Sequence, residues 1–146
     1  MKFNPEESVT GASFRPDAVL LIFSRGRLQE VLEVLEREGI AVDSFLVERE
    51  RVTAAVFFPE GREDLPDVLF RQGILSEDGF FRLILRGSRL SEGQGIAALW
   101  ESVLAREQIP VRLACSDSMG VTQYLPTARR FAVSELLNRT FGIRTL

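Results

Sequence analysis

Residues 24–43, with the sequence SRGRLQEVLEVLEREGIAVD, decide the fold of this chain. They follow the apolar run 18–23, which is typical of a strand that is covered on one or both faces. Gly26 allows the backbone to turn sharply after that strand, and the apolar residues from Leu28 onward recur at helical spacing. Gly39 is placed to cap the end of the helix. The stretch therefore predicts a strand, a glycine turn, a helix and the start of a second strand.

The same pattern returns once, 69 residues further along the chain, where Gly95 repeats Gly26. A single repeat indicates two copies of one small α/β unit rather than a solenoid. The expected order of elements in each copy is β-α-β-β-α, which is typical of ferredoxin-like units whose antiparallel sheets carry both helices on one face. We therefore predict an α+β fold of two βαββαβ units, residues 1–75 and 76–146, whose last strands can be exchanged between the units.

The two ends of the chain carry weaker patterns. Residues 1–13 are polar and predict a lead-in, with a short strand at residues 8–10. Residues 143–146 are expected to supply the last strand of the second unit.

The composition excludes several classes of chemistry. The 146 residues include no histidine, which removes the commonest general base and a common metal ligand. The net charge is −3 and the arginines are scattered, with Lys2 as the only lysine, so no basic cluster argues for a nucleic-acid partner. We therefore expect no catalytic residues, no metal site, no cofactor and no nucleic acid.

The cellular location follows from what the sequence lacks. Cys115 is the only cysteine, so no disulfide can form within the chain and a reducing compartment is expected. No apolar run approaches the ~18 residues that a membrane-spanning helix needs, and the N-terminus lacks the apolar segment of a signal peptide. We expect a cytoplasmic protein without membrane contact.

Four short motifs carry a resemblance to a known family. They are Ser24-Arg25-Gly26-x-Leu28-x-Glu30-Val31, Ile40-x-Val42-Asp43, Gly87-x-x-Leu90 and Gly95-Ile96-Ala97-Ala98. With the expected order of elements, these motifs resemble tandem ACT domains and, more narrowly, the C-terminal regulatory region of lysine-sensitive aspartokinases. The resemblance covers nearly the whole chain. The kinase domain that precedes this region in the family is absent from the sequence, so the resemblance implies a regulatory region or subunit and not an enzyme.

The resemblance also implies a site for a free amino acid where two units meet. Amides near Gly26, at the positive end of the first helix, can bind an α-carboxylate. Asp43 can bind an ammonium group. Glu48 offers a second anionic partner, whose charge the nearby Arg49 can neutralise. From the residues alone, Gly26 could equally serve only to permit a turn, and Asp43 could cap a turn or pair with a nearby arginine, Arg25 or Arg27. The ligand-binding residues expected from the resemblance are Ser24, Gly26, Arg27, Leu28, Val42, Asp43 and Glu48.

The function implied is feedback regulation by an effector of the aspartate family, lysine first and threonine second. The expected partners are that amino acid, a second copy bound through the ACT sheets, and an aspartokinase catalytic chain or domain. The chain departs from the family where it has Val47-Glu48-Arg49 in place of a Thr-Ser-Glu turn, and where Arg27 replaces an aromatic residue. These departures favour an alternative, an ACT-type interaction module that has kept the fold for oligomerisation and lost its ligand.

Overall fold

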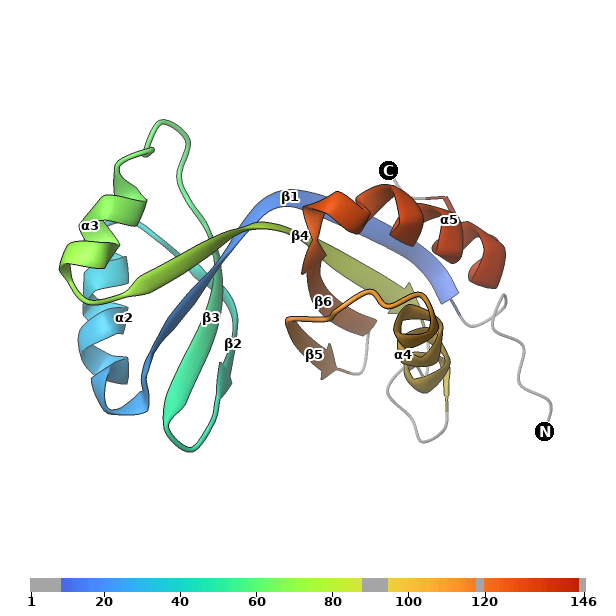
Figure 1. Ribbon diagram of the computed structural model, residues 1–146, viewed down its shortest axis with the longest axis horizontal. Coiled ribbons are helices and arrows are strands. Elements are labelled where there is room, and N and C mark those ends of the chain that lie inside the picture. The colour runs from blue at the N-terminus through green and yellow to red at the C-terminus, as the bar shows by residue number, and fades with distance from the viewer. Residues whose placement is uncertain (1–8, 88–94, 118–119, 145–146) are drawn as a thin grey trace. The chain divides into compact units, whose positions relative to one another are not determined.

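The computed structural model describes residues 9–87, 95–117 and 120–144 (Figure 1). The predicted α+β fold is confirmed: the order β-α-β-β-α occurs twice along the described chain, and antiparallel strand pairs occur in both halves of the chain. The elements are β1 (Val9–Ser24), the 3-10 turn η1 (Arg25–Arg27), α2 (Leu28–Arg37), β2 (Val42–Val47), β3 (Arg51–Phe57), α3 (Leu65–Arg71), β4 (Leu75–Gly87), α4 (Ile96–Arg106), β5 (Leu113–Asp117), β6 (Gly120–Pro126), the 3-10 turn η2 (Thr127–Arg129) and α5 (Arg130–Phe141).

The chain forms two compact units, one of residues 17–80 and one of residues 1–16 together with 81–146. The strand order is β2-β3-β1-β4-β6-β5, and both β1 and β4 contribute residues to both units. The observed grouping differs from the contiguous division at residue 75, because the N-terminal half of β1 belongs with residues 81–146. We refer to the two groups as the 17–80 unit and the 81–146 unit.

The strand that completes the 81–146 unit is the first half of β1 and not the end of the chain. Val9 is buried in that unit's core, and the Phe14 and Phe81 rings lie 4.7 Å apart between centroids. Ile143 and Arg144 belong to no strand, and residues 145–146 lie outside the described residues. The predicted strand at 143–146 is therefore wrong for its described part, because the edge that it would occupy is already filled by β1.

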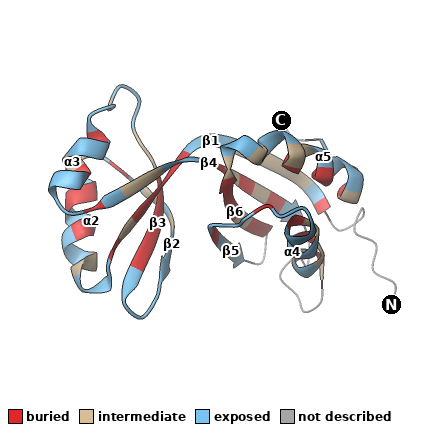
Figure 2. Ribbon diagram, viewed as in Figure 1, coloured by how far each residue is buried: buried red, intermediate tan, exposed pale blue. Residues whose placement is uncertain are grey.

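In the 17–80 unit, α2 and α3 cover one face of the sheet and share a core with β1 and β3 (Figure 2). The buried residues of α2 are Val31, Val34 and Leu35. Leu32, which helical spacing also places near the apolar face, is 40% exposed. Burial of such side chains is the main source of stability for this unit, since each contributes about 1.5–3 kcal/mol.

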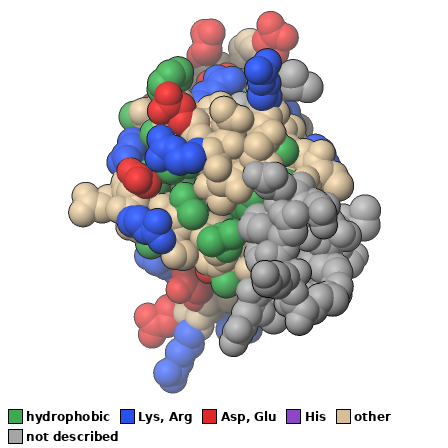
Figure 3. Space-filling model, turned by 90° about the vertical axis from the view of Figure 1, so that its right-hand side faces the viewer, with side chains coloured by type: hydrophobic (Ala, Val, Ile, Leu, Met, Phe, Trp, Pro, Cys, Tyr) green, Lys and Arg blue, Asp and Glu red, His purple; other side chains and the backbone are tan. Residues whose placement is uncertain are grey.

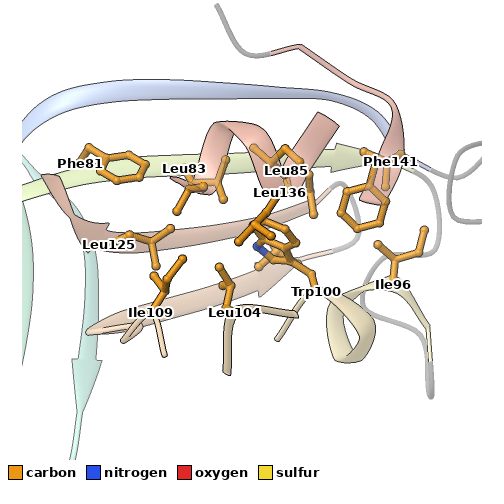
Figure 4. Close-up of a cluster of buried hydrophobic side chains, with 14 residues drawn as sticks. Phe81, Leu83, Leu85, Ile96, Trp100, Leu104, Ile109, Leu125, Leu136 and Phe141 are labelled. Carbon is orange, nitrogen blue, oxygen red and sulfur yellow. The ribbon is translucent and has the colours of Figure 1, made fainter. Parts of the chain in front are cut away.

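The core of the 81–146 unit is built around Trp100, which is fully buried between α4, α5 and the strands (Figure 4). The Trp100 indole N–H donates to the Gln123 Oε1 at 2.9 Å, so the polar atom of this large side chain is satisfied inside the core. The Phe141 ring lies 5.7 Å from the Trp100 ring between centroids and completes the contact with α5.

Three helices end in the same way, which supports the internal repeat. In each, the amide of an isoleucine just past the helix donates to a leucine carbonyl five residues earlier, at 2.8–2.9 Å. The residue before the isoleucine has a positive φ, a conformation that glycine adopts without strain. The three ends are Leu35-Gly39-Ile40 (φ 74), Leu69-Gly73-Ile74 (φ 76) and Leu104-Gln108-Ile109 (φ 57).

Gln108 stands where the other two helix ends carry glycine, and it takes the left-handed conformation at a cost of about 1–2 kcal/mol. We expect Gln108→Gly to raise the free energy of unfolding by about 0.5–1 kcal/mol, because the relief of strain exceeds the extra entropy of the unfolded glycine chain. Urea denaturation followed by circular dichroism measures this change. The matched control is Glu107→Gly, one position earlier and without a positive φ, which should destabilise instead.

Candidate functional site

The turn between β1 and α2 retains an open position at Gly26. The Arg25 amide donates to the Glu50 carbonyl at 3.0 Å, and the Leu28 amide donates to the Arg25 carbonyl. Neither of these bonds uses the Gly26 amide. A Cβ built on Gly26 would meet only the Ser24 Oγ, at 3.9 Å, and the Gly26 φ is not positive. Neither backbone strain nor crowding therefore explains a glycine at this position.

Arg27 does not point into this turn. Its guanidinium donates to the Gln72 carbonyl at 2.6 Å and to the Gly73 carbonyl at 3.1 Å, at the end of α3. The same group forms two hydrogen bonds with the Glu30 carboxylate, at 3.0 and 3.2 Å. The side chain is therefore held by the protein's own acceptors, and it contributes to the turn through its backbone.

The pairing of Glu30 with Arg27 has a consequence for acid stability. Hydrogen bonding to Arg27, followed by its charge, lowers the pKa of Glu30 below the ordinary 4.5. A carboxylate with a lowered folded-state pKa stabilises the fold above its unfolded pKa, and this contribution is lost as the pH falls through the folded-state value.

We expect Glu30→Gln to destabilise the chain above pH 4.5, the ordinary pKa of a glutamate. The difference from the native chain should shrink as the pH falls below that value, because both chains then carry a neutral side chain. Urea denaturation at a series of pH values measures it, with Glu33→Gln on the same helix as the control. A difference between Glu30→Gln and the native chain that does not change with pH would contradict the assignment.

Asp43 lies at a β-bulge near the start of β2, between Val42, which pairs with Val56, and Ser44, which pairs with Ala55. Its side chain is exposed. The extra residue of a bulge re-aims a side chain away from the regular alternation of the strand, which suits a residue that contacts a ligand.

Within one copy, Asp43 and the Gly26 turn lie at opposite ends of the sheet. Val42 is aligned through Val56 with Val19 of β1, whereas the turn follows Ser24, which pairs with Arg51. Because Val19 and Ser24 are five residues apart on β1, Val42 and the turn are about 16 Å apart along the strands, at about 3.3 Å per residue. The 17–80 unit of one copy does not bring Asp43 to the turn.

Glu48 lies at the same end of the sheet as the turn, but its carboxylate has a partner. Arg51 Nε donates to Glu48 Oε1 at 3.2 Å, and the Glu48 amide donates to the Arg51 carbonyl at 2.9 Å. The sequence suggested Arg49 as the neutralising cation, whereas the hairpin geometry selects Arg51. Of the other predicted residues, Leu28 and Val42 pack partly buried against the core, and Ser24 ends β1 with an exposed side chain.

Beside these residues lies the free edge of β2, which sequence reasoning missed as a feature of its own. Among the strands that the structure describes, β2 stands at the end of the order and pairs only with β3. Three consecutive residues of this edge strand are exposed although apolar: Phe45 (51%), Leu46 (46%) and Val47 (37%). Such an edge is a surface that another strand can join. A run of three apolar residues after Asp43-Ser44 was the signal available in the sequence.

The described residues outside the predicted site have the following features. The described part of the chain contains no group of three or more His, Cys, Asp or Glu that could hold a metal ion, and no helix long and apolar enough to cross a membrane. On the face shown in Figure 3, basic and acidic side chains are interspersed. A shallow groove of about 290 Å³ beside α5 contains none of the predicted ligand residues; it is lined by Phe131, Ser134, Glu135, Asn138, Ile143 and Arg144.

No protein-family model matches the chain, and no curated protein matches it. Solved structures do. The chain is similar to the aspartokinase alpha and beta subunits, with 18% identity and a TM-score of 0.77 over 92% of this chain and 99% of that one. It is also similar to the ligand-free regulatory subunit of Thermus thermophilus aspartate kinase, with 18% identity and a TM-score of 0.74 over 92% of this chain and 98% of that one.

A third similar structure is Escherichia coli aspartokinase III in complex with lysine and aspartate. The identity is 21% and the TM-score 0.71, over 91% of this chain and 33% of that one, so this chain spans about a third of that enzyme's length. At these identities the likeness shows the fold. The resemblance to the aspartokinase regulatory region is confirmed at that level: the chain has the fold of an aspartokinase regulatory subunit.

Proposed function

We propose that this chain is a regulatory module that binds a free amino acid at the Gly26 turn and thereby controls an aspartokinase-type kinase. The observation that carries the proposal is the turn itself. It offers an amide at the head of α2, where the positive end of the helix favours a carboxylate, and it leaves open the space that a side chain would fill. The fold, shared with aspartokinase regulatory subunits, supports the same function.

Lysine is the first candidate for the effector and threonine the second. Asp43 is an exposed carboxylate on the bulge of β2 and suits the ammonium group of an amino acid. A similar fold occurs in a structure of Escherichia coli aspartokinase III that contains lysine. The contacts of Ser24, Leu28, Val42 and Glu48 with the effector are part of this proposal, whereas Arg27 acts through its backbone.

The site is assembled from two copies of the chain. Antiparallel pairing of two β2 edges about a two-fold axis near Phe45 would place Asp43 of one copy opposite Val47 of the other. Val47 pairs with Val52 at the end of the sheet that carries the Gly26 turn. Asp43 of one copy would therefore lie at the turn-bearing end of the other copy, which it does not reach within its own copy. The exposed apolar residues of β2 supply the contact area for this homodimer.

The module has no catalytic activity of its own in this proposal, and its second partner is the catalytic chain or domain of the kinase. An effector that binds one arrangement of the paired units more tightly than another shifts the kinase between states, which is feedback inhibition in lysine biosynthesis. The lone Cys115 supports a cytoplasmic location.

One observation favours the alternative of an interaction module without a ligand. Two charged groups near the turn are already paired within the chain, Glu48 with Arg51 and Arg27 with Glu30. Fewer groups remain to bind an effector than the family pattern would provide. In that case the chain would have kept the fold only because the exposed β2 edge serves in oligomerisation.

Isothermal titration with a panel of amino acids separates the two functions. We expect L-lysine or L-threonine to bind in the micromolar to low-millimolar range, about −4 to −8 kcal/mol. Cadaverine, which keeps both amines of lysine and lacks its carboxylate, should not bind. No heat from any amino acid in the panel would contradict the sensor and leave the interaction module.

A further inference from the structure

Arg27, which stands where the family has an aromatic residue, connects two parts of the 17–80 unit that are 45 residues apart in sequence. Arg27 belongs to the turn before α2, and its two backbone acceptors, the Gln72 and Gly73 carbonyls, belong to the connection between α3 and β4. Carbonyls at the end of a helix lack partners within the helix, and a guanidinium satisfies two of them while facing the negative end of the helix dipole.

Glu30 fixes the guanidinium from the other side. Its carboxylate accepts two parallel hydrogen bonds, from Nε at 3.2 Å and from Nη2 at 3.0 Å. Such a fork restricts the orientation of the guanidinium plane, because both bonds must be kept at once. The turn, the first turn of α2 and the end of α3 are therefore connected through one side chain.

The lack of a side chain at Gly73 leaves room for the Arg27 guanidinium. A Cβ on Gly73 would lie 2.9 Å from Arg27 Nη1, and the φ of +76° already disfavours any other residue. The equivalent glycine at the end of α2, Gly39, has a similar φ of +74° and nothing within 4 Å of a built Cβ. At the α2 end Arg62 donates to the Glu38 carbonyl at 3.4 Å, but no arginine atom lies within 4 Å of a Cβ built on Gly39. The contact of a guanidinium with the glycine itself therefore distinguishes Gly73 from Gly39.

We propose that Arg27 is a positioning residue that couples the Gly26 turn to the α3–β4 connection. Ligand at the turn and order at residues 72–74 then stabilise each other. β4 begins at Leu75, directly after this connection, and runs from the 17–80 unit into the 81–146 unit. A change at the turn thus reaches the first residues of that strand without any contact between the Arg27 side chain and the ligand. The identity of the occupant rests on the proposed function, whereas the coupling does not.

Amide hydrogen exchange and amide chemical shifts of the full chain test the coupling without ligand. The Gln72, Gly73 and Ile74 amides donate to the Leu69 and Phe70 carbonyls at 2.9–3.0 Å, so their exchange reports the order of the connection. Arg27→Met should speed their exchange about tenfold, with the equivalent Gly39 and Ile40 amides unchanged. Arg27→Lys should restore only part of the protection, because an ammonium cannot reach both carbonyls and Glu30 as a fork.

Gly73→Ala tests the same connection from its other end. It should shift the amide resonances of Gly26, Arg27 and Leu28, because its Cβ displaces the guanidinium. Gly39→Ala introduces the same backbone strain without touching Arg27 and should leave those three resonances in place. Turn resonances that ignore Gly73→Ala, or that respond equally to Gly39→Ala, would overturn the coupling.

L-lysine is the probe for the ligand-dependent part. Saturating L-lysine should slow exchange at residues 72–74 in the native chain and not in Arg27→Met. Protection that persists in Arg27→Met would show that the signal takes another route and would overturn the proposal. If L-lysine changes no resonance in the native chain, lysine sensing fails, while the Gly73→Ala and Gly39→Ala comparison still decides the coupling.

Discussion

Gly26→Ala is expected to weaken binding of the effector about 10- to 150-fold while leaving the fold intact. The added Cβ would enter the open space beside the Gly26 amide and displace a carboxylate from it. The loss of a hydrogen bond to a charged group costs about 1.5–3 kcal/mol, which gives that range of affinity.

The same substitution should not destabilise the chain, which separates binding from folding. The Gly26 φ is not positive and no atom approaches the built Cβ within 3.9 Å, so alanine should raise the free energy of unfolding by up to about 1 kcal/mol through the unfolded state. Titration calorimetry and urea denaturation of one preparation measure both quantities. Gly11→Ala, in the first half of β1 with open space around its Cβ, is the matched control for both. Equal affinities of Gly26→Ala and the native chain would remove the turn from the site.

Phe45→Glu is expected to convert a homodimer into monomers. Phe45 is 51% exposed at the middle of the free β2 edge, and two-fold pairing would bring the two copies of this side chain together. A buried aromatic at the centre of an interface commonly contributes 2 kcal/mol or more, and two facing carboxylates repel, so the dissociation constant should rise on the order of 100-fold. Sedimentation equilibrium at several concentrations measures this change.

A second exposed phenylalanine provides the control for that experiment. Phe70 on α3 is 69% exposed in the same 17–80 unit and lies away from the sheet edge. Phe70→Glu makes the same chemical change and should leave the association constant as it is. A native chain that sediments as a monomer, or equal dissociation by the two variants, would contradict dimerisation through β2.

The sequence predicted the elements well where local patterns decide them. The Gly26 turn, the helix after it and the Gly39 cap follow from residue spacing within about twenty residues, and all three occur. The start of β1 was harder to predict. Pro16 and Asp17 interrupt the apolar pattern, and Asp17 has a φ of +64°, so the pattern indicated a short strand at residues 8–10 and a separate strand from residue 18 onward. In the structure β1 continues through this irregularity at the point where it passes from one unit to the other.

The candidate site was predictable only in part, because its decisive contacts are long-range. The turn and the exposed Asp43 follow from motif spacing. The redirection of Arg27 depends on carbonyls 45 and 46 residues away, and the separation of Asp43 from the turn depends on strand register. Periodicity contains neither kind of information. The pairing of Glu48 with Arg51 instead of Arg49 likewise follows from the hairpin, which brings residue 51 back beside residue 48.

The assembly of the site from two copies can be tested by mixing two variants that each bind the effector weakly. Gly26→Ala and Asp43→Asn each remove one half of the site, so a homodimer of either should bind the effector weakly. After subunit exchange, half of the dimers contain one of each, and one of their two sites has an intact turn facing an intact Asp43. Titration of the mixture with L-lysine should then recover about a quarter of the native number of sites at native affinity. Recovery of no native-affinity sites in the mixture, although both variants dimerise, would contradict a site shared between copies.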